Sequence, residues 1–239
     1  MNRKSYLVYL LPIRSIVFLL VFVIGAWITK QGIDGISNWW TIVASVVNII
    51  TILMIVLLAK KSKSSYRELI NLQKGKTKIK QIVIMTMVIL FIGTIGMYVA
   101  GFICYGVIPY MAPMMIAPIA VPLAIINVFV LPITTALAEE GLYLGCGVNQ
   151  IKNKYVAIFV PALFFALQHS FIPTVFDFKY IIYRFLSFLP LTIILCWYYY
   201  KKRNPLPIMI GHAILDVATV MMVLATSVTP ELFQMMCNM

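Results

Sequence analysis

The chain has 239 residues, of which 62% are hydrophobic and 11% are charged, and its formal net charge is +12. Soluble domains average roughly 45–50% apolar and 25% charged residues, so this composition excludes an ordinary soluble domain and favours a polytopic membrane protein. The basic residues gather at the ends of apolar runs, a pattern typical of membrane topology. We therefore expect a chain embedded in a lipid bilayer, with no nucleic-acid partner.

Seven apolar segments approach the ~20 residues that a helix needs to cross a bilayer. They lie at 6–29, 38–59, 81–107, 115–148, 155–171, 181–200 and 206–227. The fourth is too long for one straight crossing and contains three prolines, so we expect an interfacial or re-entrant piece before a helix that begins near Leu131. The fifth is short for a full span. The sequence predicts an all-α polytopic membrane helical bundle of about seven transmembrane helices, with eight as the alternative.

The loops between these segments differ sharply in charge. The loop 60–80 is rich in lysine and carries one acidic residue, Glu68, and two further basic clusters lie at 152–154 and 201–203. If seven successive helices cross the membrane in alternating directions, these loops and the N-terminus lie on one side of it. The positive-inside rule predicts that this side is cytoplasmic. The composition is compatible with a bacterium, so we expect a bacterial plasma membrane. Arg184, near the other side, should extend its charge to the headgroups.

Ionisable residues also occur inside the apolar segments. They include both histidines of the chain and three of its seven carboxylates: Glu139, Glu140, His169, His212 and Asp216. An ionisable group at bilayer depth costs at least ~2.5 kcal/mol on insertion scales, so such groups face a partner, a cavity or a site. With a rise of 1.5 Å per residue, the two histidines, Glu139 and Asp216 fall within ~10 Å of one level. The sequence therefore predicts one buried polar site.

Helix geometry indicates which of these side chains can meet. His212 and Asp216 are four residues apart and share one helix face, and Phe165 and His169 are related in the same way. Glu139 and Glu140 are adjacent, about 100° apart around the axis, so we expect only one of them to reach a common centre.

This set of residues indicates hydrolysis by water. A carboxylate and an imidazole can together activate a water molecule, and a second histidine with a carboxylate can stabilise an oxyanion. The same donor types could bind zinc, in which case Glu139, His169 and His212 would be the ligands. Ser170 follows His169 directly, but neighbours on a helix do not face each other, so water attack is favoured over a covalent intermediate.

Three short motifs carry a family resemblance. Glu139-Glu-Gly-Leu-Tyr-Leu144, Phe165-Ala-Leu-Gln-His169 and His212-Ala-Ile-Leu-Asp216 resemble, in this order, the Glu-Glu-x-x-x-Arg, Phe-x-x-x-His and His-x-x-x-Asn/Asp motifs of the CPBP family. This family comprises the CAAX proteases and bacteriocin-processing proteins, also called Abi. The resemblance covers about 115–225. We therefore expect one integral domain with two parts. Residues 1–114 contain three transmembrane helices and the basic cytoplasmic loop, and residues 115–239 form the CPBP-like core that carries the three motifs.

One position departs from the family pattern. Leu144 replaces the arginine of the first motif, so we expect Glu140 to lack a charged partner and to take up a proton. We do not expect Arg184 to replace that arginine.

The resemblance implies an intramembrane endopeptidase. Glu139 and His169 would activate water, His212 and Asp216 would stabilise the oxyanion, and Glu140 and Phe165 would support them. The substrate would be a membrane peptide, either prenylated or bacteriocin-like, and a zinc ion remains open because the family includes metalloprotease-like descriptions. Two alternatives remain: a non-catalytic relative that acts in bacteriocin immunity or as a membrane scaffold, which Leu144 favours, and a small transporter with a proton relay.

Overall fold

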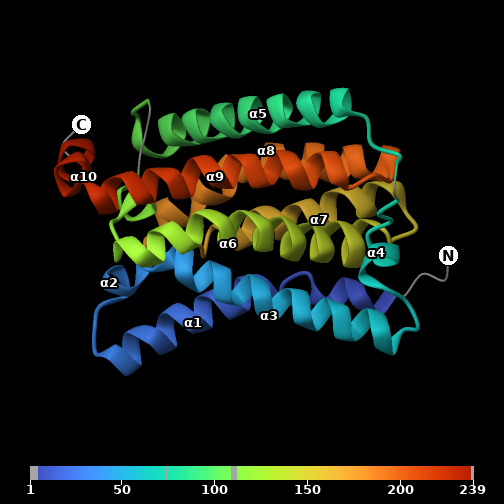
Figure 1. The fold of residues 1–239 in the computed structure, drawn as a ribbon, viewed down its shortest axis with the longest axis horizontal. Helices are drawn as coiled ribbons and strands as arrows, with labels where there is room; N and C mark the ends of the chain where they lie inside the picture. Colours follow the sequence, from blue (N-terminus) through green and yellow to red (C-terminus); the bar gives the residue numbers. More distant parts are fainter. Residues whose placement is uncertain (1–4, 74, 109–111, 238–239) are drawn as a thin grey trace.

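The computed structural model describes residues 5–73, 75–108 and 112–237, which form a bundle of helices that run roughly side by side (Figure 1). No strand occurs within these residues, which confirms the all-α prediction. The elements in chain order are η1 (Ser5–Leu10), α1 (Ile13–Thr29), α2 (Ile33–Ser37), α3 (Trp40–Lys61), α4 (Tyr66–Leu69), α5 (Ile79–Tyr105), η2 (Pro113–Ile116), α6 (Val121–Glu139), η3 (Glu140–Val148), α7 (Lys154–His169), α8 (Phe178–Lys202), α9 (Leu206–Val228) and α10 (Pro230–Cys237).

In the part of the chain that the structure describes, six stretches are long and apolar enough to cross a membrane: Tyr6–Thr29, Trp40–Lys61, Ile79–Tyr105, Val121–Val148, Phe178–Lys202 and Leu206–Val228. The remaining predicted segment, 155–171, corresponds to α7, which is an apolar helix of only 16 residues. Many large apolar side chains on the long helices are exposed, as lipid-facing positions require; examples are Phe91, Phe102 and Phe129. The chain is thus an integral, polytopic membrane bundle.

The helix that carries the first motif begins earlier than expected. We expected it to start near Leu131, but α6 starts at Val121, and only η2 and the residues up to 120 form a separate, non-spanning piece. Pro122 lies in the first turn of α6, where no intrahelical donor is needed. Pro132 lies inside the helix and removes one donor, which membrane helices tolerate when neighbouring helices pack around them.

All the basic loops meet at one end of the bundle. Tyr6 and Ser62 share a hydrogen bond of 2.8 Å, and the guanidinium of Arg203 donates to the side-chain oxygen of Asn149 at 2.6 Å. Figure 1 places α4, the N-terminal segment and the turn between α8 and α9 at the same end. These contacts confirm that the basic loops share a side, while the assignment of that side to the cytoplasm stays a prediction.

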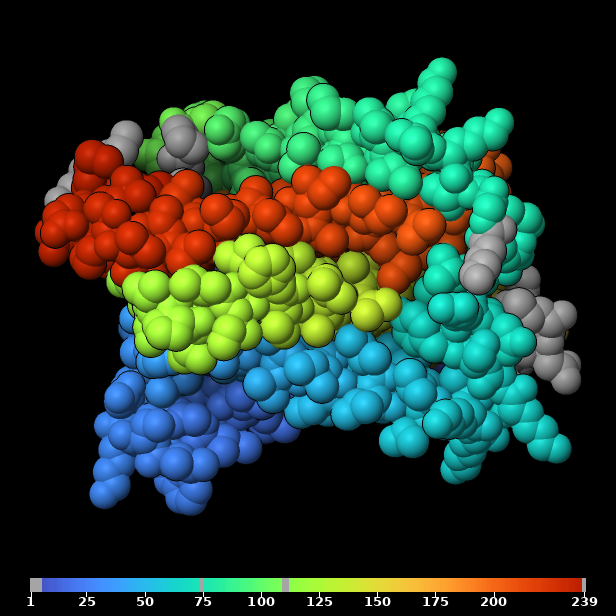
Figure 2. Space-filling view, viewed as in Figure 1, coloured from blue at the N-terminus to red at the C-terminus, as the bar shows by residue number. Residues whose placement is uncertain are grey.

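Close packing between helices fixes the layers around the motifs. In Figure 2, α9 lies between α5 and α6 on the visible face, and α3 follows beyond α6. Gly96 of α5 lies so near the backbone of α8 that a Cβ atom there would collide with the carbonyl oxygen of Ser187. Gly211 of α9 has a similarly close neighbour, because a Cβ atom would lie 2.8 Å from the side chain of Ile89. Small residues therefore bring α8 and α9 against α5.

Candidate active site

The first motif lies where the helix geometry changes. Glu139 is the last residue of α6, and Glu140 begins η3, a nine-residue π-helix. π-helical turns are rare and frequently occur at functional sites. The carbonyl oxygen of Leu137 lies at this junction and accepts from the backbone N–H of Glu140 and, at 2.5 Å, from the hydroxyl of Tyr66. The same tyrosine ring fills the space beside Gly141, so the loop helix α4 supports the turn that carries both glutamates.

His212 contacts both glutamates. Its Nδ1 lies 2.8 Å from Oε1 of Glu140, and its Nε2 lies 3.9 Å from Oε2 of Glu139. The expectation that only one glutamate reaches the site was therefore wrong. The ring carries nitrogens on two edges, so one imidazole spans two carboxylates that leave their helix in different directions. Asp216, one turn further along α9, places Oδ1 at 3.9 Å from Nε2 of His212.

The hydrogen bond to His212 also corrects the expectation for Glu140. Glu140 is fully buried and was expected to lack a partner because Leu144 replaces the arginine. Nδ1 of His212 and Oε1 of Glu140 share a hydrogen bond of 2.8 Å. The histidine of the third motif thus supplies the partner that the first motif lacks.

A second partner of the site comes from the N-terminal helix. Arg14 of α1 is 1% exposed, and its guanidinium lies 3.1 Å from Oε1 of Glu139. It also donates to three neutral side chains: Gln168 at 2.6 Å, Asn48 at 2.8 Å and Thr51 at 3.1 Å. Sequence reasoning did not identify Arg14 as a site residue. Its position eight residues inside the segment 6–29 was the available signal, because an arginine within a span is normally functional.

His169 is held by its own helix turn and by aromatic rings. Its Nδ1 lies 2.8 Å from the carbonyl oxygen of Phe165, and because that oxygen only accepts, Nδ1 carries the proton and Nε2 keeps its lone pair. The imidazole stacks on Phe188 with ring centroids 3.7 Å apart. Phe165 connects the two histidines, with centroid distances of 5.9 Å to His169 and 6.2 Å to His212. The ring of Phe165 therefore connects the histidine of the second motif to the histidine of the third.

Arg184 also departs from its prediction. We expected it to extend toward the headgroups, but it is buried and donates from Nε to the carbonyl oxygen of His169 at 3.2 Å. A second bond of 3.0 Å runs to the carbonyl oxygen of Ile172. The end of α7 leaves carbonyl groups without intrahelical donors, and Arg184 satisfies two of them. Arg184 thereby fixes the end of the helix that carries His169, and it does not replace the arginine of the first motif.

Several buried polar atoms near the motifs have no hydrogen-bond partner. They are Oε2 of Glu139, Oε2 of Glu140, Oδ2 of Asp216 and Nε2 of Gln168. More than about 90% of buried polar groups in folded proteins find a partner, so the unpaired oxygens of the three carboxylates around His212 indicate a place for water or substrate. Of the predicted site residues, Glu139, Glu140 and Asp216 lie around His212, and the ring of Phe165 lies near those of both His169 and His212.

The geometry does not fit a zinc site built from Glu139, His169 and His212. Within residues 5–73, 75–108 and 112–237, no group of three or more His, Cys, Asp or Glu side chains is arranged to hold a metal ion. We therefore derive no step of the chemistry through a metal.

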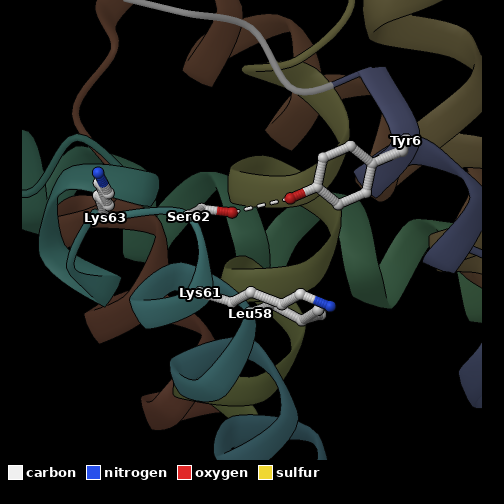
Figure 3. A pocket seen from close by; sticks show the side chains of 5 residues that line it. All are labelled: Tyr6, Leu58, Lys61, Ser62 and Lys63. Carbon is white, nitrogen blue, oxygen red and sulfur yellow. Dashed lines mark hydrogen bonds between the residues drawn. The ribbon is translucent and has the colours of Figure 1, made fainter.

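A surface pocket of about 520 Å³ lies at the basic end of the bundle, apart from the motifs. Figure 3 shows its lining side chains, with the hydroxyls of Tyr6 and Ser62 bonded to each other across it. The other lining residues are Leu58, Lys61 and Lys63. None belongs to the three motifs, so this pocket is not the candidate active site.

The fold and the cluster together define an intramembrane protein with a buried carboxylate–imidazole site. Residues 121–218 match the model of a family described as type II CAAX prenyl endopeptidase Rce1-like. The match spans less than half of the 239 residues but contains all three motifs. This match confirms the resemblance of the motifs to the CPBP family, and the family that it names is one of endopeptidases. No curated protein and no solved structure matches the chain.

Proposed function

We propose that the protein is an intramembrane endopeptidase that hydrolyses a peptide bond with a water molecule activated at Glu139. One observation carries this proposal: Glu139, Glu140 and Asp216 surround His212 inside a membrane bundle, within the segment that matches an endopeptidase family. Neither a packing role nor topology accounts for three carboxylates buried around one imidazole, because each buried charge has a cost that only a partner or a function offsets.

Glu139 has the arrangement expected of a general base. One carboxylate oxygen is anchored by Arg14, and the other, Oε2, is buried without a hydrogen-bond partner. Water bound at Oε2 would give up a proton to the carboxylate while its oxygen attacks the carbonyl carbon of the substrate. The proton would then pass to the leaving amine as the C–N bond breaks, so the products are one carboxylate and one amine. Nε2 of His169 would orient the water by accepting a hydrogen bond from its second O–H, which stays on the attacking oxygen.

His212 has the arrangement expected of an oxyanion stabiliser. Its Nδ1 is committed to Glu140, and its Nε2 lies between Glu139 and Asp216, at 3.9 Å from each. A separation of 3.9 Å is too long for a direct hydrogen bond. A protonated Nε2 at this position would donate to the oxygen of the tetrahedral intermediate, where preorganised donors act most strongly. Asp216 would stabilise the charged imidazole, Glu140 would orient it, and Phe165 would fix the spacing of the two histidines.

The substrate class follows from the location of the site. A site between membrane helices favours a membrane peptide over a soluble protein, and the family resemblance adds prenylated or bacteriocin-like peptides. The basic end of the bundle would face the cytoplasm, with the N-terminus on that side and a bacterial plasma membrane as the setting. A non-catalytic role in immunity or as a scaffold is less favoured than Leu144 suggests, because Glu140 has His212 as its partner.

The test compares membranes that contain the wild type, Glu139→Gln, His169→Ala or the control Ser45→Ala. Ser45 donates a buried hydrogen bond of 2.7 Å to Asn127, so its loss perturbs packing without touching the motifs. Mass spectrometry of small membrane peptides should show products in the wild type and the control that are absent from both motif variants. Identical peptides in all four membranes would overturn the proposal and leave a binding or immunity role.

A further inference from the structure

We propose that Arg14, on the first transmembrane helix, is a positioning residue of the active site that anchors Glu139 for water activation. This inference rests on the proposed function and extends it beyond the matched segment 121–218, because α1 lies outside that segment. The family pattern places a cation five residues after the first glutamate, where this chain has Leu144. The charge near Glu139 comes here from another helix.

The contacts of Arg14 make it a rigid anchor. All three guanidinium nitrogens donate hydrogen bonds, from Nε to Gln168, from Nη1 to Thr51 and from Nη2 to both Asn48 and Glu139. The planar guanidinium stays charged in proteins and holds its donors in a fixed fork. The four partners lie on α3, α6 and α7, so one side chain ties the first-motif helix to two neighbours.

Arg14 contacts only one of the two carboxylate oxygens of Glu139, and this one-sided contact points to a catalytic role. Among the described residues, Glu139 is the only carboxylate that pairs with Arg14, and it does so through Oε1 alone. Oε2 has no hydrogen-bond partner and faces Nε2 of His212 at 3.9 Å. A purely structural ion pair gains most from bidentate contact, which would use both oxygens. Anchoring one oxygen and leaving the other free is the arrangement that a general base needs.

Gln168 extends this anchor to the second motif. Its Oε1 accepts from Nε of Arg14 and from the hydroxyl of Tyr143 at 3.1 Å, which fixes the orientation of the amide. Gln168 immediately precedes His169 on α7, so Arg14 links the base in the first motif to the helix that carries the histidine of the second. The amide nitrogen of Gln168 is buried and unpaired, which indicates that the space beside the anchor is polar.

The test uses purified full-length protein in proteoliposomes and the membrane peptide that the wild type cleaves. The variants are Arg14→Gln, Arg14→Lys and, as a matched control, Arg67→Gln, which removes an exposed arginine from α4. Arg14→Gln should lower kcat at least about tenfold with KM nearly unchanged, because an interaction that aids the reaction more than binding is lost. Arg14→Lys keeps the charge without the fork and should recover part of that loss, while Arg67→Gln should match the wild type.

A second measurement separates a failure of this inference from a failure of the proposed function. Thermal unfolding of Arg14→Gln, Glu139→Gln and the double variant forms a mutant cycle that needs no activity. We expect non-additive shifts in melting temperature, whereas pairing Arg14→Gln with Ser45→Ala should give additive shifts. An inactive wild type with non-additive shifts would overturn the proposed function and retain the pairing. Additive shifts, or an Arg14→Gln variant with the kcat of the wild type, would overturn this inference.

Discussion

Replacement of Glu140 probes the bond that joins the first and third motifs. Glu140 is fully buried, and its Oε1 shares a hydrogen bond of 2.8 Å with Nδ1 of His212. Glu140→Ala removes one partner of this bond and leaves the buried Nδ1 of His212 unpaired, which costs roughly 1–3 kcal/mol in the free energy of unfolding. Glu140→Gln keeps an acceptor oxygen in the same volume and should cost less than about 1 kcal/mol.

The same substitutions should affect the reaction rate, because His212 depends on Glu140 for its orientation. Loss of an orienting partner of a catalytic imidazole lowers the rate by about tenfold or more, so Glu140→Ala should be much slower than Glu140→Gln. Unfolding in mixed detergent micelles and peptide cleavage in proteoliposomes measure the two effects on the same preparations. Wild-type stability and wild-type cleavage in Glu140→Ala would refute the assigned role of this bond.

Three further predictions concern packing, helix ends and pH. Gly96→Leu should destabilise the bundle by about 1–3 kcal/mol because the new side chain meets the backbone of α8, whereas Gly32→Ala, which meets nothing within 4 Å, should melt like the wild type. Arg184→Leu should leave the carbonyl of Ile172 without this donor and remove one of two donors from the carbonyl of His169, which should cost about 1–3 kcal/mol and lower the melting temperature. The pKa of Glu68 lies below its ordinary value of 4.5, first because the backbone N–H of Ser65 donates to it. Its support of α4 is therefore complete above pH 4.5 and lost as the pH falls through the lowered folded pKa. Protection of the α4 amides, relative to their intrinsic exchange rate at each pH, should fall in the same range, and constant protection would contradict this.

The membrane bundle could be predicted because hydropathy alone identifies helices that must satisfy their own backbone hydrogen bonds. The spacing of His212 and Asp216 placed them on one helix face, and the structure brings them within 3.9 Å. Basic clusters far apart in the chain predicted a common end, and the bond between Arg203 and Asn149 confirms it. These features depend on local composition or on the period of one helix, which a sequence displays directly.

The remaining features depend on how helices distant in sequence pack together. Arg14 and Glu139 are separated by 125 positions, and nothing in either segment indicates that α1 lies beside α6 and α7. The π-helix that begins at Glu140 alters the direction of the side chains. The ideal spacing of about 100° per residue therefore led to the wrong prediction that only one of the two glutamates reaches the site. The position of Arg184 near the end of a span suggested an exposed charge, although the carbonyls at the end of α7 hold it inside.

The central claim is that Glu139 activates water for attack on a peptide bond. The most direct measurement is cleavage by reconstituted wild type and Glu139→Gln in water enriched in oxygen-18, with mass spectrometry of the new carboxyl termini. Wild type should place one heavy oxygen in each new terminus, and Glu139→Gln should yield no new termini although it folds normally. Equal labelled product from both proteins would contradict the role of Glu139.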